Sequence, residues 1–283
     1  MIALTGSTGS VGEFKRHSGW TSSLTSIFLG CSLLALLLKR SDISKIYLLN
    51  RKGSATQKAR QSAGFQNRGL DPAVLDGKKN VITYLDVDFS KGDLGLTKEA
   101  YEEVSPPSVI LDATPLIIAT KLRDNVTHII HAAWHLNFNL ILESYERVHV
   151  AGVRHLIDLA LSSPQRHTPR LIFLSSIAAV GTYRGPPQRV SQGNEAGETI
   201  VPEEPINDPS IPLDQGYGQS KYVSERVIVN ATQAGLHATI VRVGQLSGVT
   251  TNGAWSTSEH VPILFRSSIA LGMIPNNLPV STS

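Results

Sequence analysis

The stretch Leu4-Thr5-Gly6-Ser7-Thr8-Gly9-Ser10-Val11-Gly12 follows a short apolar run at the start of the 283-residue chain. Its three glycines have the spacing of a dinucleotide-binding turn between a first strand and a helix. Gly6 permits a tight turn, Gly9 lets the backbone approach a pyrophosphate, and Gly12 allows close packing of the next helix. Free N–H groups at the start of that helix would hold the phosphates. The turn therefore predicts a nucleotide-binding α/β domain.

A second motif, Tyr217-Gly218-Gln219-Ser220-Lys221, lies far downstream and indicates catalysis. Tyr217 can exchange a proton with a substrate oxygen. Lys221, one helical turn away, can favour the phenolate and bind a nicotinamide ribose. Ser175 and Ser176 end an apolar strand and offer a hydroxyl to a substrate carbonyl. The turn, the serine pair and the Tyr/Lys motif, in this order, indicate a nicotinamide enzyme of the short-chain dehydrogenase type.

Between these motifs, strand-like and helix-like segments alternate, which predicts an α/β fold with a doubly wound parallel sheet, the Rossmann fold. Helices are expected over Ser32–Lys39, Leu140–Ser162 and Ser220–Ala234, the last closed by Gly235 as a C′ glycine. Pro186–Pro212 is expected to be a surface excursion. The apolar runs expected to form buried strands are Ile2–Leu4, Lys45–Leu49, Val81–Asp86, Val126–His131, Arg170–Leu174 and Ala238–Val243.

The composition narrows the classes of function. A net charge of +3 without a run of Lys or Arg argues against nucleic-acid binding. Cys31 is the single cysteine, so a disulfide framework is excluded and a reducing, cytoplasmic compartment is expected. The nine histidines show no metal-ligand spacing, so no metal is expected. The apolar run Ile27–Leu38 is too short to span a membrane and is expected to be a helix packed on the sheet.

Residues after the predicted strands indicate the cofactor. Arg51 and Lys52 follow the second strand, where an acidic residue would bind a ribose 2′-hydroxyl, and their charges suit a 2′-phosphate instead. NADPH is therefore expected rather than NADH. Asp88, after the third strand, can accept a hydrogen bond from an adenine amino group or cap a surface turn. Ala132 and Ala133, after the fourth, are small enough for the cofactor to lie against the backbone.

Eight groups of segments carry a wider resemblance: Gly6–Gly12, Asn50-Arg51, Asp88–Ser90 with Leu94–Leu96, Val126–Trp134 with Asn137–Asn139, Gly152–Ile157, Phe173–Ser176, Gly216–Lys221 and Arg242–Gly248. Together they closely resemble the thioester reductase domains of fungal nonribosomal-peptide-synthetase-like carboxylic acid reductases and aminoadipate reductases. These are extended short-chain dehydrogenases of the male-sterility type.

The resemblance implies NADPH-dependent reduction of an acyl thioester on the phosphopantetheine arm of a carrier protein. The product would be an aldehyde or alcohol, and the setting secondary metabolism. It implies a catalytic triad of Ser176, Tyr217 and Lys221, with Ser175 as the fallback for Ser176. The cofactor-binding residues implied are Gly6, Ser7, Thr8, Gly9, Val11, Gly12, Asn50, Arg51, Lys52, Asp88, Phe89, Ala132, Ala133, Trp134, Ser175, Tyr217, Lys221 and Gly244.

The chain also departs from this family. Glu13–Gly30 interrupts the glycine turn and its helix, and Val104–Lys121 separates two family-like segments. The codons of Gly12-Glu13 and Val104-Ser105 can spell a splice-donor sequence, so we hypothesise that both stretches are retained introns. Genuine loops are the alternative.

The chain ends at Ser283, soon after the first residues of the substrate region. Residues 1–283 are therefore expected to form a single reductase-like domain with an incomplete C-terminal substrate lobe. Two other functions stay open at this point. One is an extended short-chain dehydrogenase acting on a nucleotide sugar, and the other is a catalytically defective NADP-binding fragment.

Overall fold

The computed structural model describes residues 1–8, 25–96, 122–164, 168–185, 200–250, 252–255, 257 and 259–276. Its six-stranded, all-parallel sheet has the strand order β3-β2-β1-β4-β5-β6. The order reverses between β1 and β4, as in doubly wound dinucleotide-binding folds. The predicted fold is therefore confirmed. The strands are β1 (Ile2–Thr5), β2 (Ile46–Arg51), β3 (Ile82–Val87), β4 (His128–His131), β5 (Arg170–Ser176) and β6 (Ala238–Val243).

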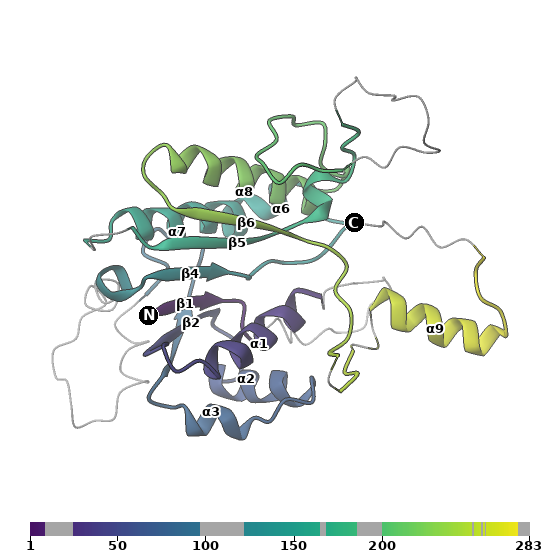
Figure 1. Cartoon of the computed structure of the whole chain (residues 1–283), viewed down its shortest axis with the longest axis horizontal. Coiled ribbons are helices and arrows are strands. Elements are labelled where there is room, and N and C mark those ends of the chain that lie inside the picture. The colour runs from purple at the N-terminus through teal and green to yellow at the C-terminus, as the bar shows by residue number, and fades with distance from the viewer. Residues whose placement is uncertain are drawn as a thin grey trace.

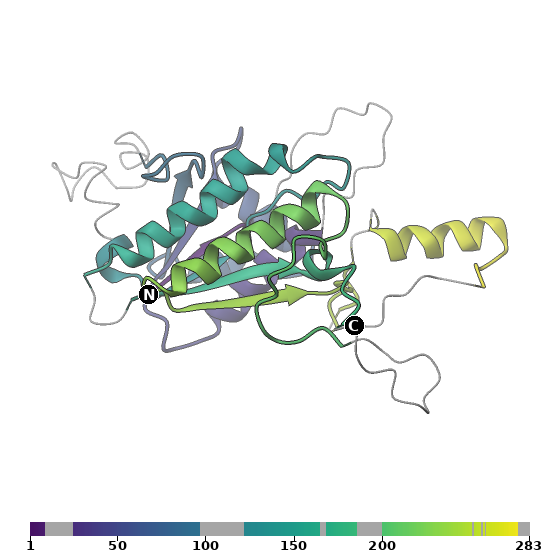
Figure 2. The same cartoon turned by 90° about the horizontal axis from the view of Figure 1, so that it is seen from above.

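Helices cover both faces of the sheet (Figure 1). On one face lie α1 (Thr25–Leu38), α2 (Gln57–Gln66) and α3 (Ala73–Gly77). On the other lie α6 (Glu143–Tyr145), the π-helix η1 (Glu146–Val150), α7 (Ala151–Leu161) and α8 (Gly216–Thr232). Figure 2 shows α7 and α8 running side by side over the strands. The 3₁₀ turn η2 (Ile177–Val180) follows β5, and α9 (His260–Leu271) projects away from the sheet in both views.

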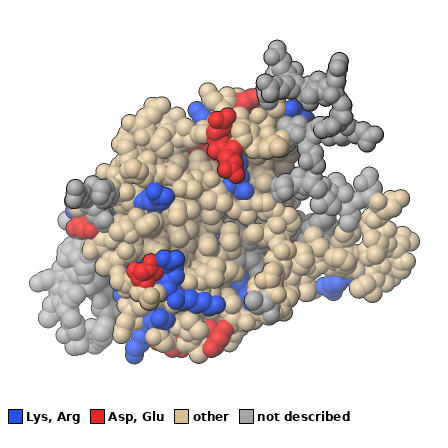
Figure 3. All heavy atoms as spheres, in the orientation of Figure 1, with Lys and Arg blue, Asp and Glu red and all other residues tan. Residues whose placement is uncertain are grey.

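The apolar run at Ile27–Leu38 forms most of α1, as expected. Cys31, Leu34 and Leu38 are buried and pack in one cluster with the strand residues Leu4 and Leu48. Such burial stabilises the layer by roughly 1.5–3 kcal/mol for each large side chain. Within the described segments, no helix combines the length and apolarity that crossing a bilayer requires. Figure 3 shows Lys, Arg, Asp and Glu side chains together over the region of α2 and α3.

Three predicted helices exist with different bounds. Helix α1 begins at Thr25 rather than Ser32, and α8 begins at Gly216 rather than Ser220. The helix expected over Leu140–Ser162 is divided into α6, η1 and α7.

Two further expectations concern the ends of these elements. Gly235 has the positive φ of +92° of a C′ glycine, and Leu236 N–H donates to the Ala231 carbonyl at 3.2 Å, so the helix stop is confirmed. Residues 200–212 contain no helix or strand. The rest of the expected surface excursion, 186–199, lies outside the described residues, as do 13–24 and 104–121 of the two interruptions.

Candidate active site

The described residues of the expected site gather at the carboxyl edge of the sheet and on α8, which packs over β5. Because all strands are parallel, the residues that follow them meet at this edge. Gly9, Val11 and Gly12 lie outside the described residues. At this edge stand Gly6, Ser7 and Thr8 after β1, Asn50, Arg51 and Lys52 at β2, Asp88 and Phe89 after β3, Ala132, Ala133 and Trp134 after β4, Ser175 and Ser176 at β5, and the partly buried Gly244 after β6.

The glycine turn packs directly on the end of β4. Gly6 has φ +74°, and a Cβ there would lie 2.7 Å from Ala133 N, so only glycine fits. The Thr5 hydroxyl accepts hydrogen bonds from Ala132 N–H at 3.1 Å and Ala133 N–H at 3.0 Å. The same hydroxyl lies 2.8 Å from His131 Nδ1. Since its oxygen already accepts twice, its proton is directed to His131, which holds β1 and β4 together beneath the turn.

Helix α1 approaches the turn at Gly30. A Cβ on Gly30 would lie 2.2 Å from the Gly6 carbonyl oxygen. The neighbouring Cys31 thiol donates to the Ser7 carbonyl at 2.9 Å. The sequence predicts such a close approach at Gly12, which lies outside the described residues. Among the described residues, Gly30 makes one.

Asn50 connects the turn to the end of β2. It is buried, and its amide donates to Ser7 Oγ at 2.9 Å and to Gln57 Oε1 at 3.1 Å. Its Oδ1 lies 3.5 Å from Thr8 N. Asn50 therefore supports the shape of the turn from beneath.

Three basic side chains lie near the end of β2. Arg51 and Lys52 are exposed, as a role in binding a phosphate requires. Arg60 on α2 donates to the Arg51 carbonyl at 2.6 Å and lies 3.7 Å from Asp86, while its buried Nε has no hydrogen-bond partner among the described residues. Sequence reasoning missed Arg60, because it is nine residues beyond Arg51 and only the turn into α2 brings it back.

Asp88 and Phe89 have different surroundings. The Asp88 carboxylate accepts from Ser90 N–H at 3.0 Å and Ser90 Oγ at 2.6 Å, and these bonds hold its pKa below the usual value. The described contacts are thus those of a turn cap, and adenine binding by Asp88 stays a prediction. Phe89 is buried with its ring centroid 5.7 Å from that of His131.

The three residues of the expected triad lie together. The Ser176 side chain faces the Tyr217 phenol closely enough to lower its pKa, and Ser176 Oγ accepts from Ala178 N–H at 3.1 Å. Lys221, one turn along α8, donates from Nζ to the Leu174 carbonyl at 2.6 Å. The Ser175 hydroxyl donates instead to Glu225. Of the two serines, Ser176 is therefore the one that faces the phenol.

Burial sets the electrostatics of this group. Lys221 is buried, with Nζ 3.9 Å from the centroid of the Trp134 ring and 6.0 Å from that of Tyr217. Burial lowers the pKa of Lys221 well below its usual value, and the Glu225 carboxylate opposes that shift. Burial raises the pKa of Tyr217, while the Ser176 side chain lowers it. The phenol of Tyr217 is therefore protonated near pH 7, and the protonation of Lys221 depends on the balance between its burial and the Glu225 carboxylate.

The glycines on either side of Tyr217 let the start of α8 pack closely against neighbouring backbone. A Cβ on Gly216 would lie 2.3 Å from the Ile141 carbonyl carbon, and one on Gly218 would lie 2.7 Å from the Ala178 carbonyl oxygen. The backbone of Tyr217 is thereby held between two neighbouring backbone segments. Phe138, half-exposed, lies edge-on to Tyr217 with ring centroids 5.4 Å apart. Sequence reasoning missed this packing, although the Gly-Tyr-Gly pattern is visible.

His149 packs against Trp134, whose ring also contacts Lys221. It belongs to the π-helix η1, a distortion often found at functional sites. Its ring centroid is 4.9 Å from that of Trp134. Burial, with a further contribution from the charge of Lys221, lowers the pKa of His149 to about 3, so the imidazole is neutral near pH 7.

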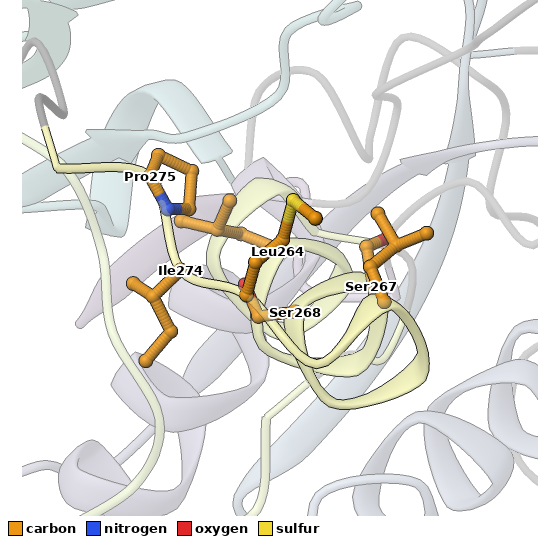
Figure 4. Close-up of a pocket in the computed structure, with 7 residues that line it drawn as sticks. Leu264, Ser267, Ser268, Ile274 and Pro275 are labelled. Carbon is orange, nitrogen blue, oxygen red and sulfur yellow. The ribbon is translucent and has the colours of Figure 1, made fainter.

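A cavity of about 210 Å³ lies along α9 rather than at this edge (Figure 4). None of its lining residues belongs to the group around Tyr217, so the cavity is not the candidate active site. The residues that line it are Leu264, Ser267, Ser268, Leu271, Met273, Ile274 and Pro275.

Comparison with known proteins identifies the family. A model of NAD-binding domains described as "Male sterility protein" matches residues 27–112 and 118–282. The chain belongs to this family. It is 36% identical over 277 residues to the adenylate-forming reductase Nps9 of Serpula lacrymans var. lacrymans, a match that covers 98% of this chain and 20% of that protein. It is 30% identical over 285 residues to the carboxylic acid reductase of Neurospora crassa, covering 100% and 22%.

Solved structures share the fold. The terminal R domain of the myxalamid PKS-NRPS pathway has a TM-score of 0.66 at 25% identity, covering 96% of this chain and 56% of that one. The PhqB reductase domain from Penicillium fellutanum has a TM-score of 0.59 at 21% identity, covering 95% and 55%. The resemblance inferred from the sequence is confirmed. The chain spans about a fifth of the length of the curated relatives named above.

Proposed function

We propose that this chain reduces an acyl thioester, carried on the phosphopantetheine arm of a carrier protein, to an aldehyde with NADPH. The observation that carries the proposal is the placement of the Ser176 side chain beside the Tyr217 phenol, with Lys221 one helical turn away, at the sheet edge that also holds the glycine turn. Family membership supports it, because the similar curated proteins are reductases of carboxylic acids and adenylate-forming reductases.

The residues at the edge fit a nicotinamide dinucleotide. Gly6, with its positive φ and no side chain, lets the tight turn after β1 pack directly against the end of β4, as a dinucleotide-binding turn requires. Arg51 and Lys52 are exposed beside Arg60, whose Nε is buried without a hydrogen-bond partner among the described residues. Three cations at the end of β2 favour a 2′-phosphate, so the cofactor proposed is NADPH rather than NADH. When bound, this cofactor supplies a hydride.

The chain's own residues would activate the substrate carbonyl. Tyr217 and Ser176 donate hydrogen bonds to the thioester oxygen, where negative charge develops as the carbon is reduced. Tyr217 then gives its proton to that oxygen, and Lys221 stabilises the phenolate left behind. The resulting hemithioacetal collapses to the aldehyde and the free thiol of the arm.

We further propose a reducing, cytoplasmic setting. The single cysteine, Cys31, is buried as a free thiol hydrogen-bonded to the Ser7 carbonyl, and burial raises its pKa, so it stays unreactive. A free thiol beneath the glycine turn supports a compartment where thiols stay reduced.

Incubation of the full chain with NADPH and an acyl-pantetheine thioester tests the proposal. Loss of nicotinamide absorbance together with a trapped aldehyde is the expected result. Tyr217→Phe should abolish turnover and leave NADPH affinity, measured by cofactor fluorescence, largely unchanged, because the phenol acts on the substrate oxygen. Unchanged kcat in that variant would remove Tyr217 from the mechanism.

The other outcomes identify the alternatives. Turnover of a nucleotide sugar without any aldehyde from thioesters would replace thioester reduction by another short-chain dehydrogenase activity. NADPH binding without turnover of either substrate would show a catalytically defective NADP-binding fragment.

A further inference from the structure

The end of β5 is tied to one face of α8 by three polar contacts. Tyr217, Lys221 and Glu225 follow one another at intervals of four residues, so they lie along a single stripe of the helix. Each faces a different residue of the strand end, and Lys221 and Glu225 hydrogen-bond to theirs. The pairs are Tyr217 with the Ser176 side chain, Lys221 with the Leu174 carbonyl and Glu225 with the Ser175 hydroxyl.

Glu225 is a buried carboxylate whose two oxygens both accept hydrogen bonds. Only 3% of its surface is exposed. Arg242 on β6 donates to it from Nη2 at 2.8 Å and from Nε at 3.2 Å. Arg242 also donates to the carbonyls of Pro202 at 3.3 Å and Glu204 at 3.4 Å. The ion pair therefore joins α8, β5, β6 and the segment before α8 at one point.

We propose that Glu225, held by Arg242, is a positioning residue for the triad: it fixes the end of β5 against α8 and places a carboxylate one helical turn from Lys221. This inference rests on the proposed function. Glu225 touches no reacting atom. It acts through Ser175, which directly precedes Ser176, and through Lys221, one turn earlier on α8.

The groups that face Lys221 from each neighbouring element give Glu225 this electrostatic role. They are Tyr217 and Glu225 on α8, His131 on β4 and His149 on η1. Burial lowers the pKa of both histidines, so both are neutral near pH 7. Glu225 is the group that raises the pKa of Lys221 against the effect of burial. Removing its charge should therefore let Lys221 lose its proton at lower pH.

Three variants of the full chain separate positioning from folding. Glu225→Gln removes the charge but leaves the partly buried Arg242 without its carboxylate partner, which costs stability. The double variant Glu225→Met with Arg242→Met removes both charges and retains volume, a replacement that buried ion pairs often tolerate. Asp158→Asn is the matched control, because it breaks the exposed Arg154–Asp158 pair on α7. Circular dichroism and the thermal midpoint verify folding of each.

The expected result is a fall in kcat of about 10- to 100-fold in the double variant, since displaced catalytic groups lose rate steeply. KM for NADPH and thioester should stay within about twofold, because no binding contact is removed. The basic limb of the kcat profile should move to lower pH. Asp158→Asn should match the wild type. A folded double variant with wild-type kcat and an unmoved pH profile overturns the proposal.

Ser175→Ala shows whether Glu225 acts through Ser175. If it does, the losses of kcat in Ser175→Ala and Glu225→Gln are not additive in the combined variant. Fully additive losses would give Ser175 an independent role and overturn that part of the proposal.

A readout without turnover separates this proposal from the proposed function. Titration of Lys221 itself is obtained by nuclear magnetic resonance, from the side-chain signal that is lost in the Lys221→Gln counterpart of each background. Without the Glu225 carboxylate the charged form of Lys221 is stabilised less, so Lys221 should titrate at lower pH in the double variant. If the wild type reduces no thioester but this shift occurs, the proposed function fails and the electrostatic role of Glu225 stands. An unmoved titration overturns that role.

Discussion

Gly30→Ala tests how the glycine turn is supported. The added Cβ would lie 2.2 Å from the Gly6 carbonyl oxygen and 3.1 Å from Ser7 Cα, whereas ordinary contacts begin at 3.4 Å. Both neighbours are backbone atoms and cannot rotate away. Helix α1 and the turn must therefore separate by about 1 Å, against the packing of Cys31 and Leu34 on the sheet.

The cost follows from this overlap. Inserting a methyl group into a well-packed interior costs about 1–3 kcal/mol. Alanine is the better helix former by about 0.5–1 kcal/mol, which offsets part of that cost. A net loss of about 1–2 kcal/mol should lower the thermal midpoint by about 2–8 °C. A displaced turn should also lose the equivalent of one hydrogen bond to a charged group, about 1.5–3 kcal/mol, so the Kd for NADPH should rise about tenfold or more.

Thermal unfolding followed by circular dichroism and a fluorescence titration with NADPH measure both effects. Gly77→Ala is the matched control, because a Cβ on this helical glycine of α3 meets nothing within 4 Å. The control should be neutral or slightly stabilising and should bind NADPH like the wild type. If Gly30→Ala is as stable as Gly77→Ala and binds NADPH equally well, the close approach of α1 to the turn does not support the cofactor site.

Three further predictions concern the cofactor, acid stability and the interruptions. Arg51→Ala should weaken NADPH about tenfold and NADH little if its charge pairs with the 2′-phosphate as proposed. Equal losses in a fluorescence titration would refute that role. Burial lowers the pKa of His149 from 6.5 to about 3, so the wild type should lose stability as the pH falls from 6.5 towards 3. In His149→Gln the thermal midpoint should fall less over this pH range. An identical decline in both proteins would count against the burial of a neutral His149. Deleting Glu13–Gly30 and Val104–Lys121 should strengthen NADPH binding if both are retained introns, and a spliced transcript that carries both would end that hypothesis.

The sheet could be predicted because its strands are buried on both faces. Parallel strands between two helical layers appear in a sequence as short, nearly continuous apolar runs, such as Ile46–Leu49 in β2. Helix α2 has no such signal. Its inward positions Gln57 and Gln61 are buried polar groups bonded to Asp86 and to the Ser7 carbonyl, so its pattern shows no apolar stripe. Only the tertiary partners of these side chains explain their burial.

Much of the candidate site could be placed from the motifs, but its supporting contacts could not. The order of turn, serine pair and Tyr/Lys motif was sufficient to bring Ser176, Tyr217 and Lys221 to one edge. The start of α8 was predicted too late because Gly216 and Gly218 are poor helix formers. The structure explains both glycines by backbone contacts that no local pattern encodes. Glu225 was missed for a related reason, since its meaning depends on Arg242, which lies on another element.

The contact at Gly30 also bears on the interruption Glu13–Gly30. In the chain as it stands, the residue before Cys31 is a glycine, and its lack of a side chain lets α1 touch the Gly6 carbonyl. Removal of Glu13–Gly30 would join Gly12 to Cys31, so the residue before Cys31 would again be a glycine. The close approach of helix and turn can therefore survive the deletion, because both chains meet its one requirement. Loss of a glycine before Cys31 therefore could not explain weaker NADPH binding by the deleted chain. Such a result would indicate that Glu13–Gly30 is a genuine loop.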